Sequence, residues 1–198
     1  AETTRTWSGG DKPLEYTATG KWIVLRKKEK PAAEIFSVSY VAKDGNEDRP
    51  VTFVFNGGPG ASSAYLHLGA VGPKRVEFPP DGTLPEMPPR LVQNEASWLA
   101  FSDLVFVDPV GTGFSRIIET DKKGDDKEKK EDGVDPKEFF GEKRDLESMC
   151  EFMSRWLSGR RRWGSPVFIA GESYGGYRVG RLARMLQETT GIGLNGAI

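Results

Sequence analysis

The sequence predicts an α/β domain whose sheet begins antiparallel and continues parallel. Three short apolar runs have the composition of buried strands: VTFVFN (51–56), DLVFVD (103–108) and PVFIAGES (166–173). Amphipathic helical segments flank the third run. Buried strands that alternate with amphipathic helices are typical of parallel sheets covered by helices.

The region before these strands predicts an antiparallel meander. EYTATGKWIVLRK (15–27) and EIFSVSYVAK (34–43) are rich in β-branched and aromatic residues. The segments KEKPAA and DGNEDRP are rich in turn-forming residues and indicate turns after each strand.

Two helices are expected around the third apolar run. Asp135 can cap the first helix and Pro136 suits its first position. One face of this helix would carry Phe139, Phe140, Leu146, Met149, Cys150, Met153, Trp156 and Leu157. The second helix spans roughly 177–189, and GLNGAI (193–198) is expected to begin another strand. The segment 121–135 mixes both charges and predicts a solvated loop.

Composition indicates one domain and excludes several classes of partner. The 198 residues carry 28 basic and 29 acidic side chains, so neither nucleic acid nor a membrane surface is an expected partner. The mean hydropathy is −0.50, and no apolar run approaches the ~20 residues of a membrane span. We expect neither a cofactor nor a metal.

The only cysteine, Cys150, cannot form an internal disulfide and is expected to be a buried core residue. The chain begins at Ala1 without an initiator methionine, which fits either a processed, exported protein or an edited sequence. A secreted or periplasmic location is the expectation.

GESYG (171–175) has the G-x-S-x-G pattern of a nucleophile elbow, placed between a buried strand and a helix. The strained turn leaves no room for side chains beside the serine, which explains Gly171 and Gly175. It would direct the Ser173 hydroxyl to the N-terminus of the next helix, where developing negative charge is favoured. An ordinary strand–helix turn is the alternative.

FNGGPGASS (55–63) follows another buried strand and could direct backbone N–H groups at an oxyanion or a carboxylate. A plain turn and a phosphate loop are the alternatives, although a phosphate loop would require a lysine that is absent here. The third motif, VDPVGTGFS (107–115), is interpreted as a structural loop that shapes the site. Asp108 precedes the serine, whereas the triad acid of α/β-hydrolases follows it.

These three motifs, in this order and spacing, resemble the serine carboxypeptidase family, peptidase family S10. ASSAYLHLGAVGP resembles its bacterial branch, and the resemblance extends from about Val51 to the C-terminus. It implies an α/β-hydrolase fold, of which this chain would hold an incomplete, N-terminal part. It also implies a serine-type carboxypeptidase that releases C-terminal residues through an acyl-enzyme.

The resemblance implies a role for each of six residues. Ser173 would be the nucleophile, and the amides of Gly58 and Tyr174 would form the oxyanion hole. The free C-terminal carboxylate of a peptide substrate would be bound by Asn56, Gly57 and Glu172. An Asn amide can donate to a carboxylate, whereas a Glu can do so only when it is protonated.

Two positions depart from the eukaryotic pattern of the family. Ala61 stands where that pattern has a disulfide cysteine, and Ala70 stands where it has a second glutamate. Two close carboxylates share a proton and thereby favour acidic conditions. Without the second one, we expect a higher pH optimum than that of the eukaryotic members.

The serine needs a base, and the only histidine, His67, precedes it in the chain. Because the triad histidine should follow the serine, we expect a packed or hydrogen-bonded role for His67. The triad Asp and His are therefore expected beyond Ile198, in a following segment or an associated C-terminal chain. Residues 1–198 alone should be inactive.

Three alternatives remain at this point. An esterase or acyltransferase could use the same elbow, and a proline iminopeptidase also has a GGPG loop, although a histidine usually precedes that loop and Asn56 does so here. A non-catalytic peptide-binding relative could retain the pocket without the triad.

Overall fold

The computed structural model describes residues 1–45, 47–118 and 135–198. The predicted charged loop, apart from Asp135, lies outside these ranges. The described residues form a mixed eight-stranded sheet in the order β1-β2-β3-β7-β4-β9-β10, with β8 paired to β3, and a separate two-stranded sheet. The strands of the mixed sheet are β1 (Glu2–Trp7), β2 (Leu14–Lys27), β3 (Lys30–Ala42), β4 (Val51–Phe55), β7 (Asp103–Val107), β8 (Arg116–Ile117), β9 (Val167–Gly171) and β10 (Leu194–Ala197).

The pairing changes from antiparallel to parallel along the sheet, as the sequence predicts. β1, β2, β3 and β7 pair antiparallel. β7, β4, β9 and β10 pair parallel, so their carboxyl ends meet at one edge. Ligands of open α/β sheets bind outside the carboxyl ends of the strands, so this edge is the first place to look for a site.

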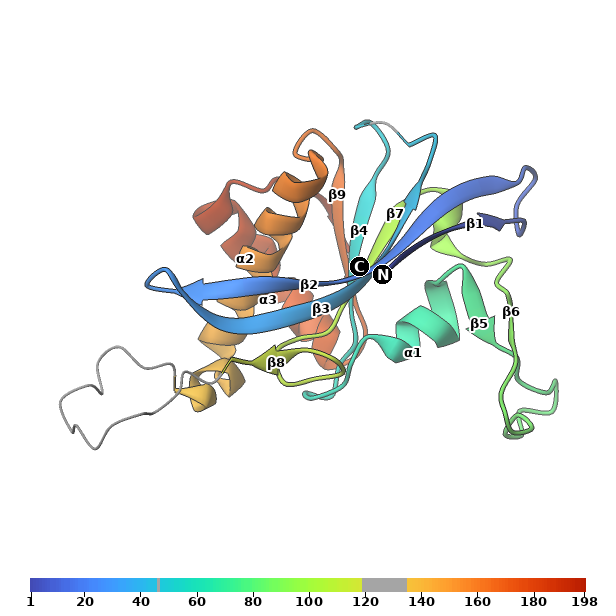
Figure 1. The fold of residues 1–198 in the computed structure, drawn as a ribbon, viewed down its shortest axis with the longest axis horizontal. Coiled ribbons are helices and arrows are strands. Elements are labelled where there is room, and N and C mark those ends of the chain that lie inside the picture. The colour runs from blue at the N-terminus through green and yellow to red at the C-terminus, as the bar shows by residue number, and fades with distance from the viewer. Residues whose placement is uncertain (46, 119–134) are drawn as a thin grey trace.

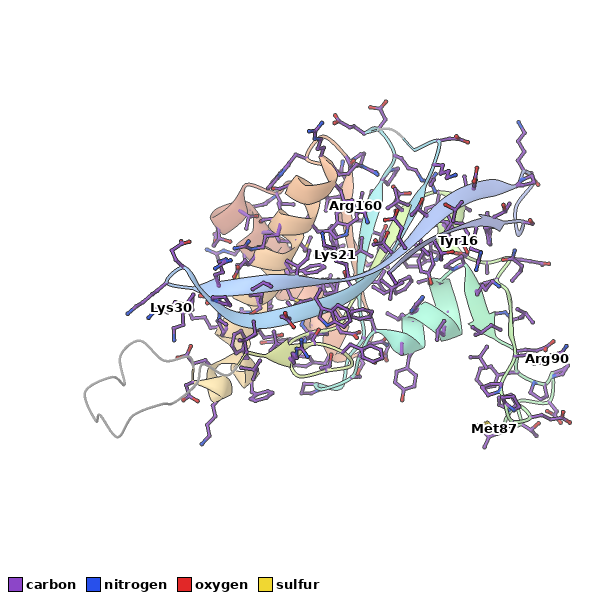
Figure 2. All side chains as sticks on the ribbon, in the orientation of Figure 1. Tyr16, Lys21, Lys30, Met87, Arg90 and Arg160 are labelled. Carbon is purple, nitrogen blue, oxygen red and sulfur yellow. The ribbon has the colours of Figure 1, made fainter. Side chains whose placement is uncertain are left out.

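Figure 1 shows helices α2 (Glu142–Arg160) and α3 (Tyr174–Thr190) together on one face of the sheet. The other face carries the short helix α1 (Ala64–Leu66), which continues as a π-helix over His67–Val71, and the hairpin of β5 (Lys74–Val76) and β6 (Leu91–Gln93). Figure 2 shows that Met87 lies at the far end of the excursion between β5 and β6, away from the sheet, and that Arg90 lies closer to β6.

Side-chain alternation along the buried strands divides the core into two layers. Phe53 and Phe55 of β4 pack with α2 and α3, whereas Val54 belongs to the cluster on the other face. Cys150 lies in the first cluster, as predicted, and burial raises the pKa of its thiol to about 11. None of the described helices is both long enough and apolar enough to cross a membrane.

Two local predictions are wrong. KEKPAA is not a turn throughout, because the hairpin closes over Lys28 and Glu29 at positive φ and β3 begins at Lys30. A two-residue hairpin turn with positive φ at both central residues matches the twist of the flanking strands. Here Lys28 and Glu29 adopt it, although neither is a glycine.

The helix predicted from Asp135 is broken. Asp135 caps a 3₁₀-helix (Pro136–Phe140), and α2 begins after Gly141. Phe139 is buried and Phe140 is exposed, because a 3₁₀-helix has three residues per turn and adjacent side chains therefore point in different directions. The helix after the serine begins at Tyr174, three residues earlier than predicted.

A buried ionic cluster joins β3, β7 and the turn before β9 at the amino ends of the parallel strands. Asp103 is fully buried, and its Oδ1 accepts hydrogen bonds from Arg49 Nε and the Ala42 amide, both at 2.9 Å. Its Oδ2 accepts one from Arg162 Nη1 at 2.6 Å. Each carboxylate oxygen is therefore paired with a cation, which a buried charge requires.

Candidate active site

Ser173 sits in a strained turn between β9 and α3. Its backbone has φ 57° and ψ −122°, a conformation that L-residues rarely adopt, and its side chain is exposed. A Cβ at Gly171 would overlap the Gly175 carbonyl, and a Cβ at Gly175 would overlap the Phe55 carbonyl. The two glycines are therefore required by close backbone packing, as expected for a nucleophile elbow.

The glycine-rich loop after β4 lies directly against this elbow. A Cβ at Gly57 would lie 2.7 Å from Ser173 Cβ, 2.7 Å from the Tyr174 nitrogen and 2.8 Å from the Glu172 oxygen. The Glu172 amide also donates to the Phe55 carbonyl at 3.2 Å, which continues the β4–β9 ladder to the edge of the site. Two motifs more than 100 residues apart in sequence are thus brought into backbone contact.

Asn56 and Glu172 form a polar pair beside the serine. Asn56 Nδ2 donates to Glu172 Oε2 at 3.3 Å, while Asn56 Oδ1 accepts the Leu66 amide at 2.9 Å. The Leu66 contact orients the Asn56 side chain, because an amide oxygen held by a donor turns the NH₂ group to the other side. Asn56 is buried and Glu172 is exposed, so a fixed, buried amide group lies beside an accessible carboxyl group.

The two amides expected to form the oxyanion hole, those of Gly58 and Tyr174, lie on either side of the contact between Gly57 and the elbow. Tyr174 is the first residue of α3, and the first amides of a helix have no partner within the helix. Gly58 follows the Gly57 contact, is exposed and has φ 105°, which favours glycine. The assignment of the oxyanion hole to these two amides stays a prediction.

Asp108, the residue after β7, accepts hydrogen bonds from two backbone amides next to the site. Its Oδ1 accepts the Ser63 amide at 2.9 Å and its Oδ2 accepts the Phe114 amide at 3.4 Å. Burial raises the pKa of its carboxyl group, and these two amides oppose that rise. Ser63 Oγ in turn bonds the carbonyls of Val54 and Val107, so the ends of β4 and β7 are joined beneath the glycine loop. The structural role predicted for this motif agrees with these contacts.

His67 lies on the face of the sheet opposite α2 and α3, where its ring is hydrogen bonded and packed. Its Nε2 is 2.5 Å from the Tyr40 hydroxyl, and its ring stacks on Phe106 with centroids 4.5 Å apart. Burial lowers the pKa of His67 to about 4, so the ring is neutral at physiological pH. This is the packed, hydrogen-bonded role expected from the sequence.

Sequence reasoning missed Arg178, which the structure brings into the site. Arg178 is buried on α3 and contacts both the Asn56 carbonyl and Asp145 of α2. The available signal was a charged residue four positions before the buried Leu182, on the apolar face of a predicted helix. A charge at such a position indicates a buried ion pair. Among the described residues, no cluster of His, Cys, Asp and Glu could hold a metal ion.

Comparison with known proteins identifies the family. A family model described as "Serine carboxypeptidase" matches residues 21–195. The chain belongs to the serine carboxypeptidase family. The more specific resemblance to the bacterial branch stays a prediction.

The serine carboxypeptidase relatives include fungal processing enzymes. The chain is 37% identical over 139 residues to the pheromone-processing carboxypeptidase KEX1 of Saccharomyces cerevisiae, which covers 67% of this chain and 16% of that protein. It is 34% identical over 145 residues to the pheromone-processing carboxypeptidase of Talaromyces marneffei, covering 72% of this chain and 19% of that protein.

A solved structure supports the fold. The crystal structure of KEX1(delta)p, a prohormone-processing carboxypeptidase from Saccharomyces cerevisiae, matches with a TM-score of 0.64 and 27% identity, covering 91% of this chain and 37% of that chain. The mixed sheet and this likeness establish an α/β-hydrolase fold. The chain spans less than a fifth of the length of the curated relatives described above.

Proposed function

We propose that this chain supplies the nucleophile and the carboxylate-binding group of a serine carboxypeptidase. The observation that carries the proposal is the contact of the Asn56–Gly57 loop with the elbow of Ser173. A nucleophile and a fixed amide donor then lie side by side at the carboxyl edge of the sheet. A peptide whose terminal carboxylate is held by the donor would present its last peptide bond to the serine.

The proposed reaction is acyl transfer to water. Ser173 Oγ attacks the carbonyl carbon of the last peptide bond while a histidine takes its proton, and the amides of Gly58 and Tyr174 stabilise the oxyanion. Collapse of this intermediate breaks the C–N bond, and the histidine returns the proton to the leaving amine. Water then hydrolyses the acyl-enzyme by the same route and restores the serine.

The proposal places the triad Asp and His outside residues 1–198. Ser173 is exposed, and the only histidine of the chain is hydrogen bonded to Tyr40. A following segment or an associated chain would supply both groups. We propose peptides with a free C-terminal carboxylate as the substrate class, and a secreted or periplasmic location.

The test pairs chemical labelling with a matched substrate comparison in the full-length protein. A fluorophosphonate should label Ser173 in the wild type and should not label S173A, because only an activated serine reacts. A blocked dipeptide with a free carboxylate should be cleaved faster than the same dipeptide with a C-terminal carboxamide.

Each contrary result identifies one of the alternatives. Equal turnover of the acid and the amide would remove the carboxylate-binding role and would favour an esterase or acyltransferase. Absence of labelling in the folded wild type would indicate a non-catalytic binding protein.

A further inference from the structure

Arg178 is a buried cation placed between the two halves of the candidate site. Its side chain is 4% exposed. Nη1 donates to the Asn56 carbonyl at 3.3 Å, Nε donates to Asp145 Oδ2 at 2.9 Å, and Cζ lies 5.2 Å from the centre of the Tyr174 ring. One guanidinium therefore contacts the residue before Gly57 and the residue after Ser173.

The contact with Asn56 fixes a peptide plane. The Asn56 carbonyl and the Gly57 N–H belong to the same trans peptide, and a trans peptide directs these two groups to opposite sides. Holding the carbonyl against Arg178 therefore sets the direction of the Gly57 N–H. The same contact anchors the backbone of Asn56, whose side chain is held independently by Leu66.

The packing around the carbonyl shows why the anchor has to be a long, forked cation. A Cβ at Gly175 would lie 3.0 Å from the Asn56 oxygen, so α3 approaches this carbonyl closely and offers no nearby side chain to it. Arg178 reaches it from further along the helix. Its planar fork can bond a carboxylate and a carbonyl at once, which a lysine ammonium does less rigidly.

Asp145 holds the other end of this fork. It lies in the first turn of α2, where a carboxylate is favoured by the helix dipole, and only 15% of its side chain is exposed. The neighbouring pair of the same two helices is different. Arg181 and Glu142 also join α3 to α2, with 2.8 Å between Nε and Oε1, but their side chains are 59% and 42% exposed and Arg181 donates to Glu142.

We propose that Arg178, held by Asp145, is a positioning residue that orients the 56–57 peptide to receive the substrate carboxylate. The inference rests on the proposed function, because it assigns the direction of an amide that the proposed function uses. Arg178 acts through this peptide and does not touch the substrate. Its loss should reduce the preference for a free carboxylate more than it reduces turnover in general.

The experiment measures kcat/KM for the blocked dipeptide and for its carboxamide in the full-length protein. The variants are R178Q and R178K, and R181Q is the matched control from the exposed pair on the same helices. The ratio of the two kcat/KM values is the readout, because the concentration of active enzyme cancels from it. Partial unfolding of a variant therefore cannot imitate the expected result.

The acid-to-amide ratio should fall at least tenfold in R178Q and should change less than twofold in R181Q. R178K keeps the positive charge opposite Asp145, so it provides the measurement if R178Q does not fold, and it should lose a smaller part of the ratio. An unchanged ratio in the folded R178 variants would overturn the inference while leaving the proposed function standing. A wild type that cleaves the free acid and the carboxamide with equal kcat/KM would overturn the proposed function, and the inference with it.

Discussion

Replacement of Gly57 by alanine tests the contact on which the site depends. The added Cβ would lie 2.7 Å from Ser173 Cβ and 2.7 Å from the Tyr174 nitrogen. Non-bonded heavy atoms prefer separations of about 3.5–4.0 Å, so the loop and the elbow must move apart by roughly 1 Å. Two of the three closest atoms belong to the backbone, and no side-chain rotation can relieve those contacts.

G57A should lower both the reaction rate of Ser173 and the free energy of unfolding. A displacement of about 1 Å between reacting groups can lower a rate by about 10²-fold. Overpacking in a well-packed region destabilises by about 1–3 kcal/mol. In the full-length protein we therefore expect G57A to fold, with a lower free energy of unfolding, and to lose about two orders of magnitude in the fluorophosphonate labelling rate of Ser173.

G180A is the matched control for this experiment. Gly180 lies on the exposed side of α3, and a Cβ there meets nothing within 4 Å. Alanine at such a helical position should stabilise by about 0.5–1 kcal/mol and leave labelling unchanged. A folded G57A that labels within threefold of the wild-type rate would refute this expectation, since Gly57 could then not lie as close to Ser173 as described.

Four further predictions concern stability, pH and reactivity. D103N should lower the free energy of unfolding by about 3–5 kcal/mol in denaturant titrations, because it leaves the buried Arg162 and the partly buried Arg49 without their carboxylate. E34Q, at an exposed pair, should change it by less than about 1 kcal/mol. The pKa of His67 is lowered to about 4, below its unfolded value near 6.5, so the unfolded chain binds more protons than the folded chain between these two pH values. The free energy of unfolding should therefore be highest above pH 6.5 and should fall by about 2–3 kcal/mol towards pH 4. H67Q should not show this loss. Because burial raises the pKa of Cys150 to about 11, iodoacetamide at pH 8 should alkylate it only after unfolding, and rapid alkylation of the folded protein would contradict its burial. A70E should move the pH optimum of activity downwards, and an unchanged pH–rate profile would show that the residue at position 70 does not set the pH optimum.

The elements that local pattern determines were predictable. β4, β7 and β9 coincide with apolar runs, since a strand buried on both faces needs apolar residues throughout. The elbow was predictable because its turn admits only glycine at Gly171 and Gly175. The same holds for His67, whose position before the serine argued against a role as the base.

The elements that depend on distant contacts were not predictable. Gly141 ends one helical segment and begins another, although the apolar pattern continues through it. Arg178 joins Asp145, 33 residues away, and Asn56, 122 residues away. No local pattern specifies such pairs, and the sequence offered only a charge at an apolar position.

The parallel strands divide two tasks between their ends. Ser173, the glycine loop and Asp108 follow the carboxyl ends of β9, β4 and β7, whereas the Asp103 cluster secures the opposite ends of the same strands. Selection for a new substrate and selection for heat tolerance can therefore act on separate sets of positions. An engineer could strengthen the amino-terminal rim of this sheet while leaving the chemistry at the other rim to diversify.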